Sequence, residues 1–166
     1  MASLTGNSNI AVTFNESGTF DLVSGSSQHR KSASLAWLSG SGAGQCNKIY
    51  SDSFSVAQST NTDLDLAGSL TGVYGTVVFT AIKGILIVAG TNTGLGNLVV
   101  GNVTNGIVAP FGAATHSIAV APGGVFFIAN PSAAGFAITA TTADLLRIAT
   151  SATAGTYTFD VVIWGI

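Results

Sequence analysis

The stretch GTYTFDVVIWGI, residues 155–166, decides the fold class because it reads clearly as a β-strand. Side chains of a strand alternate between two faces. One face is wholly apolar and consists of Tyr157, Phe159, Val161 and Ile163. The other face begins with polar residues and ends with Val162, Trp164 and Ile166. We expect the first face to lie in a core. The C-terminal half of the second face should be covered by the N-terminal segment or by another subunit.

Short β-rich segments of this kind fill the chain from Lys48 onward, and turn-forming sequences such as APFG, APGG and NPSAAG separate them. We expect strands near residues 49–56, 62–67, 75–81, 83–90, 97–101, 115–120, 124–129, 135–140, 144–149 and 156–165. Strong helical periodicity is absent. Many short strands without helices between them predict an all-β fold, an antiparallel β-sandwich of jelly-roll type over residues 48–166.

Residues 1–47 differ in composition from the rest of the chain and predict an N-terminal hairpin followed by a Ser/Gly-rich arm. IAVTF and TFDLV flank NESG, so residues 10–23 predict a small hairpin with Gly18 in its turn. An isolated hairpin is barely stable in water, so we expect it to pack on something else. Residues 24–47 are dense in Ser and Gly and predict a flexible connector, with an apolar anchor made of Leu35, Trp37 and Leu38.

The scarcity of charge is the main anomaly of the composition. Only 7% of the residues are charged, against about 25% in typical globular domains, and residues 84–143 carry no Asp, Glu, Lys or Arg. Three interpretations of so low a charged fraction compete: a membrane protein, an aggregating chain, or a protein whose surface is largely covered by partners. No window reaches the roughly 18 apolar residues of a spanning helix, so we expect no membrane partner. The N-terminal MASLTGNSNI predicts no signal peptide.

Charge also bears on nucleic acid as a partner. The formal net charge is −2, with five Lys and Arg residues in all. Binding to phosphates needs a basic stripe, which this chain lacks, so we expect no nucleic-acid partner.

The segment VFFI, residues 125–128, is apolar on both faces of its expected strand. Val125 and Phe127 point opposite to Phe126 and Ile128. A sheet within the chain covers one of these faces. We therefore expect a partner subunit to cover the other.

Paired carboxylates are the first candidates for chemistry. Asp63 and Asp65 lie on one face of a strand, roughly 7 Å apart, which is near the separation in inverting glycosidases. The alternation with inward leucines favours a simpler interpretation, in which both carboxylates solvate the outer face of a half-buried sheet. Arg147 alternates with apolar neighbours, and we expect it to pair with Asp144 or with an adjacent strand.

Metal and nucleophile sites have little support in the sequence. His29 and His116 lie in different regions without a second ligand at zinc spacing. Cys46 is the single cysteine and has neither a CxxC partner nor a neighbouring cationic helix start. We expect no catalytic residue, no cofactor and no metal, and therefore no enzyme.

Four stretches together resemble small virion structural proteins of tailed bacteriophages, in particular capsid decoration or cement proteins. They are GAGQCNKIYSDSFSVAQSTNTDLDLAG (residues 42–68), IKGILIVA (82–89), APGGVFFIA (121–129) and DLLRIAT (144–150). The resemblance covers roughly residues 42–166, whereas residues 1–41 match less clearly.

The resemblance implies a jelly-roll domain that forms a homotrimer on the outside of an icosahedral capsid, near the local threefold positions. Its partners would then be the major capsid protein and itself. Its location would be the virion exterior, after synthesis in the bacterial cytoplasm. Residues 1–41 suggest the means of attachment, with hairpin strands 10–14 and 19–23 added to a sheet edge of the shell or of a sister subunit. The apolar positions expected to need cover on assembly are Leu35, Trp37, Leu38, Phe126, Ile128, Trp164 and Ile166.

Two alternatives stay open at this point. The first is a head-fibre or tail-associated sandwich that binds host-surface glycans. It requires a solvent-exposed aromatic platform drawn from Trp37, Trp164, Tyr50, Tyr74 and Tyr157. The second is an enzyme that uses Asp63 and Asp65, although no convergent catalytic set accompanies them.

Overall fold

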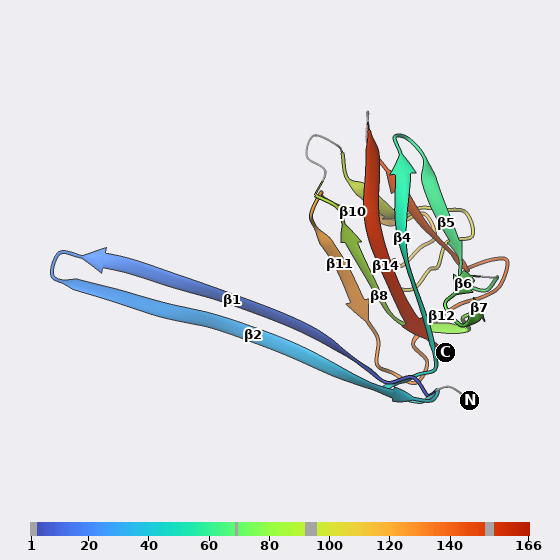
Figure 1. Ribbon diagram of the computed structural model, residues 1–166, viewed down its shortest axis with the longest axis horizontal. Helices are drawn as coiled ribbons and strands as arrows, with labels where there is room; N and C mark the ends of the chain where they lie inside the picture. Colours follow the sequence, from blue (N-terminus) through green and yellow to red (C-terminus); the bar gives the residue numbers. More distant parts are fainter. Residues whose placement is uncertain (1–2, 69, 92–95, 152–154) are drawn as a thin grey trace.

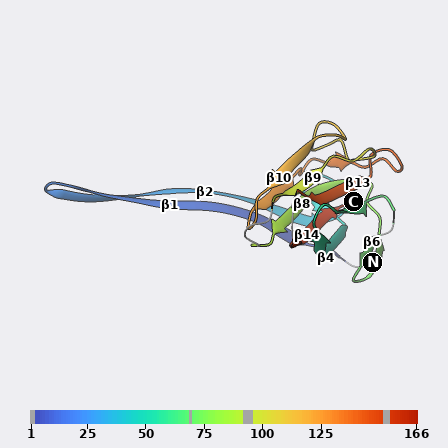
Figure 2. The ribbon, with the colours of Figure 1, turned by 90° about the horizontal axis from the view of Figure 1, so that it is seen from above.

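The computed structural model describes residues 3–68, 70–91, 96–151 and 155–166, and its regular elements in these ranges are all β-strands (Figure 1). The structure has two parts. A long two-stranded hairpin projects from a β-sandwich in both ribbon views (Figures 1 and 2). Among the described residues, no helix has the length and apolarity needed to cross a membrane.

The sandwich has two antiparallel sheets. The first, here called the β8–β14 sheet, has the order β11 (Val125–Ala129), β8 (Ala81–Ala89), β14 (Thr156–Gly165) and β4 (Lys48–Ala57), with β12 (Phe136–Ala137) also paired to β8. The second, here called the β9–β13 sheet, has the order β10 (Ser117–Val120), β9 (Leu98–Gly101), β13 (Leu145–Thr150) and β5 (Asn61–Asp65). A small ribbon of β6 (Leu70–Gly72) and β7 (Gly75–Val77) completes this part. An all-β fold with several antiparallel sheets, consistent with a sandwich, is therefore confirmed.

The core lies between the two sheets and follows from side-chain alternation. Strand β14 buries Tyr157, Phe159, Val161 and Ile163, as its pattern predicts. Strand β8 contributes Ile85 and Ile87 to the same cluster. The facing sheet supplies Leu64, Leu98, Val100, Leu146 and Ile148, all of them buried. Each of these side chains contributes roughly 1.5–3 kcal/mol through removal from water, so this interface holds the sandwich together.

The strands of the sandwich pair in a nested order. The first strand, β4, pairs with the last, β14, from Lys48↔Gly165 to Ala57↔Thr156. The next strand inward, β5, pairs with β13, and β8 pairs with β11. The innermost pair is β9 with β10. The chain thus behaves as one long folded-back ribbon whose successive pairs lie alternately in the two sheets.

The hairpin consists of β1 (Gly6–Phe20) and β2 (Val23–Ser39), which pair from Gly6↔Trp37 to Phe20↔Val23. The predicted turn at Gly18 is wrong, because Gly18 lies inside the ladder opposite Gly25 and the chain reverses after Phe20. The flexible connector predicted from residue 24 is also wrong as far as Ser39. Ser and Gly have weak strand preferences, but a continuous partner strand overrides such preferences.

The hairpin is attached to the sandwich at its root. A short strand, β3 (Gln45–Cys46), pairs in parallel with the end of β2 through Leu38↔Gln45 and Ser39↔Cys46. Strand β1 is consequently an edge strand of the three-stranded sheet β1-β2-β3. The chain then enters β4 directly, so the hairpin root lies beside the C-terminal end of β14, as Figure 1 shows.

Several of the predicted strands are shorter than expected, and two differ most. The segment expected at residues 75–81 splits into β7 and the start of β8, and the segment expected at 135–140 is reduced to β12. Lys83 contacts the loop that precedes β12. Its side chain is fully buried and its ammonium donates to the carbonyl oxygens of Ser132 and Ala133, which holds the preceding loop against β8.

Candidate interaction surface

The hairpin root is held by a second, smaller core. Trp37, Cys46 and Trp164 are buried together, and the two indoles meet edge to face with ring centroids 5.8 Å apart. Trp37 Nε1 donates a hydrogen bond to Ser8 Oγ at 2.8 Å, which joins β2 to β1. The predicted cover for Trp164 is confirmed, since the indole is only 7% exposed and the N-terminal segment provides the cover.

This arrangement corrects the role expected for Trp37. We expected Leu35, Trp37 and Leu38 to need cover on assembly, but Trp37 is already covered within its own chain. Leu35 packs partly against the same cluster. Leu38 is exposed beside it and remains available for contacts outside the chain.

The loop of residues 131–133 accepts hydrogen bonds from Lys83 and from the hairpin root. Burial lowers the pKa of the Lys83 ammonium, and the two carbonyl groups of residues 132 and 133 accept its hydrogen bonds. The same loop accepts a bond from the backbone N–H of Gly44 at the Pro131 carbonyl oxygen, at 2.8 Å. Burial raises the pKa of the neighbouring Cys46 thiol, which keeps that thiol protonated and unreactive. These contacts attach the root of the hairpin to the sandwich, and we call this region, around Trp37, Cys46 and Trp164, the joint.

The outer face of the β8–β14 sheet is apolar close to this joint. Strand register places Phe127, Leu86 and Val162 side by side in one row across β11, β8 and β14. The next row away from the root contains Val125, Val88 and Asp160, and it ends the apolar area. Val125 is 60% exposed. A second apolar layer thus lies on the solvent side of this sheet.

The position of the VFFI segment settles which of its faces is inward. Phe126 is buried in the core and Ile128 packs against it, so both belong to the sandwich interior. Phe126 is therefore covered within the chain and Ile128 is partly covered there, so neither residue needs a partner subunit to be removed from water. Val125 and Phe127 form the outward face instead. The sequence could not distinguish the two faces, because both are apolar.

The register of the hairpin defines two different faces. One face, here called the apolar face, carries Trp37 at the root and then Ile10, Val12 and Phe14, with Phe14 68% exposed. Toward the tip the same face carries Lys31, His29 and Glu16, and the last two side chains lie 3.5 Å apart. Leu22 at the tip is 96% exposed. The opposite face consists mainly of Asn, Ser and Thr side chains, and Gln28 Nε2 donates to Asn15 Oδ1 across it at 3.0 Å. The alternation in IAVTF was the signal for this face.

A groove of about 770 Å³ lies where the two apolar surfaces converge. One wall is the outer face of the β8–β14 sheet, and the other is the root of β1. No charged side chain of the described residues lines it. Its lining residues are Leu4, Thr5, Gly6, Asn7, Ser8, Asn9, Ile10, Ala11, Trp37, Cys46, Ile49, Leu86, Val125, Phe127, Val162 and Trp164. We call this space the root groove.

Ile166, the last candidate, takes part in strand pairing. Its backbone N–H donates to the carbonyl oxygen of Ala81 at 2.9 Å, and its carbonyl oxygen accepts from Thr80 at 2.7 Å. The residue is half-buried at the end of the sheet. It belongs to the frame of the sandwich more than to the root groove.

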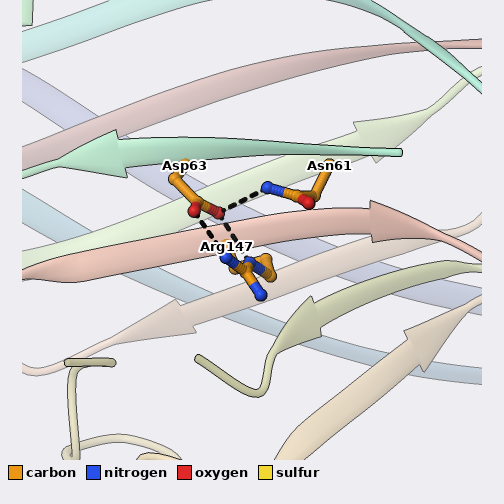
Figure 3. Close-up of polar contacts among 3 residues, drawn as sticks. All are labelled: Asn61, Asp63 and Arg147. Atoms are coloured by element: carbon orange, nitrogen blue, oxygen red, sulfur yellow. Dashed lines mark hydrogen bonds and ion pairs between the residues drawn. The ribbon is translucent and has the colours of Figure 1, made fainter. Parts of the chain in front are cut away.

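Asp63, one of the two paired carboxylates, is held in an ion pair. Arg147 holds Asp63 through two hydrogen bonds of 2.7 and 2.6 Å, and Asn61 donates a third at 3.0 Å (Figure 3). The Arg147 hydrogen bonds lower the pKa of Asp63 below its ordinary value, which suits an ion pair and not a proton donor. The pairing of Arg147 with an adjacent strand is confirmed, since β13 and β5 are neighbours.

The remaining candidates are dispersed. Within the described ranges, no three His, Cys, Asp or Glu side chains come close enough to hold a metal. The His116 ring nitrogen Nδ1 lies 3.0 Å from the carbonyl oxygen of Phe111. Asp144, considered as a partner of Arg147, instead accepts a hydrogen bond from the backbone N–H of Thr141 in its own turn.

The aromatic residues bear on glycan binding. Trp37, Trp164, Tyr50 and Tyr157 are all buried, whereas Tyr74 is 99% exposed at the tip of the β6–β7 ribbon. One isolated tyrosine at the end of a small ribbon is not a stacking platform of several rings.

No family model, curated protein or solved structure is significantly similar to this chain.

Proposed function

We propose that this protein is a non-enzymatic structural protein of a bacteriophage virion, which binds the outside of the assembled capsid as a decoration or cement protein. The observation that carries the proposal is the hairpin, a ribbon of 15-residue and 17-residue strands that projects from the sandwich and exposes Ile10, Val12 and Phe14 on one face. Two-stranded ribbons are marginal in water, so the hairpin fits a chain that works bound to other subunits.

We also propose that the sandwich is a jelly roll. The nested pairing supports this, because first strand pairs with last and each inner pair follows the same rule across two sheets. Jelly rolls recur in viral shell proteins, and this architecture also occurs in lectins and other proteins, so it supports the proposal without specifying it.

The exposed surfaces fit the work of a cement protein. Ile10, Val12 and Phe14 of the hairpin and Val125 on the outer face of the β8–β14 sheet offer exposed apolar contacts. A protein that binds only the assembled, expanded shell stabilises that state through its differential affinity. Many copies, proposed here as homotrimers near the local threefold positions, would add their effects over the whole shell.

The test is binding to shells. Empty expanded shells would be assembled from the major capsid protein encoded in the same genome, and the purified chain would be added and sedimented with them. We expect saturable co-sedimentation and a higher melting temperature of the shells. Unexpanded shells serve as the matched control and should bind less. Absence of co-sedimentation with expanded shells would contradict the proposal.

A further inference from the structure

A second hollow, of about 300 Å³, lies on the outer face of the β9–β13 sheet and shares no lining residue with the root groove. Alternation along β13 sends its other side chains into the core, so Arg147 and Ala149 point outward. Strand register places Ala149 between Asn61 of β5 and Val99 of β9. These residues belong to its lining, and we call this space the polar hollow.

Three side chains of the polar hollow have hydrogen-bonding groups left for a ligand. Arg147 donates to Asp63 through Nε and Nη2, whereas its Nη1 has no partner among the described residues (Figure 3). Asn61 donates to Asp63 through Nδ2, and its side-chain oxygen accepts nothing from the described residues. The amide of Asn102 makes no side-chain hydrogen bond within the same ranges. The hollow therefore offers both donors and acceptors.

The rim of the polar hollow is fixed before a ligand arrives. Two hydrogen bonds, of 2.7 and 2.6 Å, hold the guanidinium of Arg147 on Asp63. The hydroxyls of Thr60 and Thr150, which also line the hollow, both donate to the carbonyl oxygen of Ala57, at 2.7 and 3.1 Å. Side chains that are already ordered lose little conformational entropy when a ligand binds. The site thus resembles a preformed one.

The charges around the polar hollow favour a neutral ligand. Arg147 is the only charged side chain of the described residues in its lining, and Asp63 balances that charge across 2.6 Å. The carboxylate repels an anion and the guanidinium repels a cation. Hydroxyl groups both donate and accept, which matches the mixed groups of the rim. Val99 and Ala149 add small apolar side chains, which suit the C–H groups of a ring.

We propose that the polar hollow binds one unit of a neutral saccharide. Its volume is at the lower end for ligand sites, which suits a single sugar ring. Hydroxyl groups of the sugar accept from Arg147 Nη1 and exchange hydrogen bonds with the amides of Asn61 and Asn102. This mode of binding needs no row of aromatic rings, unlike the stacking platform considered above. The inference goes beyond the proposed function, and binding to shells does not depend on it.

The test is ligand-observed NMR on the full chain. The probes are the methyl glycosides of glucose, galactose, mannose and N-acetylglucosamine, and inorganic phosphate is the charged probe. We expect saturable binding of at least one glycoside with a Kd of ~1–10 mM, as suits a few hydrogen bonds without ring stacking. Phosphate should bind more weakly than that glycoside.

Two variants locate the binding site. Ala149→Leu fills the hollow without removing a hydrogen-bonding group, and Asn102→Gly removes the amide at a φ of 60°, which glycine adopts freely. Each should weaken glycoside binding by about tenfold or more. Ala36→Leu and Asn47→Ala, at exposed positions outside the hollow, are the matched controls and should bind like the unchanged chain. Circular dichroism checks that each variant is folded.

Three results would overturn the inference. One is the absence of saturable binding for every glycoside up to ~50 mM. Another is glycoside binding that Ala149→Leu and Asn102→Gly leave unchanged, because the sugar then lies outside the polar hollow. The third is tighter binding of phosphate that the same variants weaken, because the hollow is then an anion site. Failure of shell binding would contradict the proposed function alone.

Discussion

The indole of Trp37 lies edge to face against the indole of Trp164, with an angle of 68° between the ring planes. Trp37 belongs to the hairpin and Trp164 to the last strand of the sandwich. This contact, together with the pairing of β2 and β3, fixes the hairpin to the sandwich. The direction in which the hairpin projects therefore depends on a few side chains at its root.

Replacing the first of these indoles should loosen the joint. Trp37→Ala removes a buried aromatic side chain and its hydrogen bond to Ser8, so we expect a loss of about 3 kcal/mol in the free energy of unfolding. Chemical denaturation measures this loss. Limited proteolysis should also show faster cleavage at residues 37–46. Leu38→Ala, at the exposed neighbour, is the control, and an equal effect of both changes would contradict the assigned role of Trp37.

Gly84 should tolerate no side chain. A Cβ at this position would lie 2.0 Å from Trp164 Cζ2, because the indole packs directly on the backbone of β8. Gly84→Ala must displace the indole, and we expect a destabilisation of about 1–3 kcal/mol with a changed tryptophan fluorescence spectrum. Gly25→Ala is the matched control, since a Cβ there meets nothing within 4 Å. A stable Gly84→Ala variant with unchanged fluorescence would show that the indole does not occupy this place.

Tyr157 offers a change expected to stabilise the protein. Its side chain is fully buried, and within the described residues no group lies in hydrogen-bonding reach of its hydroxyl. Burial raises the pKa of this hydroxyl. Tyr157→Phe removes an unsatisfied polar group and keeps the ring, so we expect the free energy of unfolding to stay equal or rise by about 1 kcal/mol.

The matched change is Tyr50→Phe. The Tyr50 hydroxyl donates a hydrogen bond to Asp52 at 3.2 Å. Burial, together with the nearby Asp52 carboxylate, raises the pKa of the Tyr50 hydroxyl to about 12. Loss of that bond should cost roughly 0.5–1.5 kcal/mol. Thermal unfolding of both variants at neutral pH distinguishes the two cases. Destabilisation by Tyr157→Phe would mean that its hydroxyl has a partner in solution.

The ion pair of Asp63 and Arg147 should give a defined pH dependence. Because Arg147 lowers the pKa of Asp63 below 3.8, the stabilisation is present above that pH and is lost as the pH falls through the lowered pKa. For a partly exposed pair we expect about 0.2–1 kcal/mol at neutral pH. Asp63→Asn should remove this acid-dependent loss, as measured by unfolding between neutral and acidic pH.

The control is Asp65→Asn, on the same strand and the same face. It lies outside the Arg147 pair, so its effect on stability at neutral pH should be smaller than that of Asp63→Asn. A double-mutant cycle with Arg147→Met isolates the pair. A coupling energy of zero would show that the ion pair contributes nothing in solution.

Strand positions were predictable because turn residues and alternation act locally. The core face of β14 and the cover over Trp164 followed from this pattern, and so did the pairing of Arg147 with an adjacent strand. These features need only knowledge of which residues share a face. A strand with one apolar and one polar face leaves little choice about its orientation.

Other features depended on partners distant in sequence. Phe126 and Val125 are both apolar, so their orientation was decided by pairing with β8 and not by their own strand. The Ser/Gly-rich residues of β2 have weak preferences, and only the facing β1 makes them a strand. The root groove was not predictable at all, since β1, β8, β11 and β14 meet there from both ends of the chain.

The nested order of pairing also has a consequence for synthesis on the ribosome. Strand β4 cannot find its partner until β14, the last strand, has been made, so the sandwich closes only after translation has reached that end of the chain. Such pairings between distant segments form slowly. The hairpin, by contrast, needs only neighbours in sequence and is complete after Ser39. Its apolar face is therefore present in the cell before the domain that carries it.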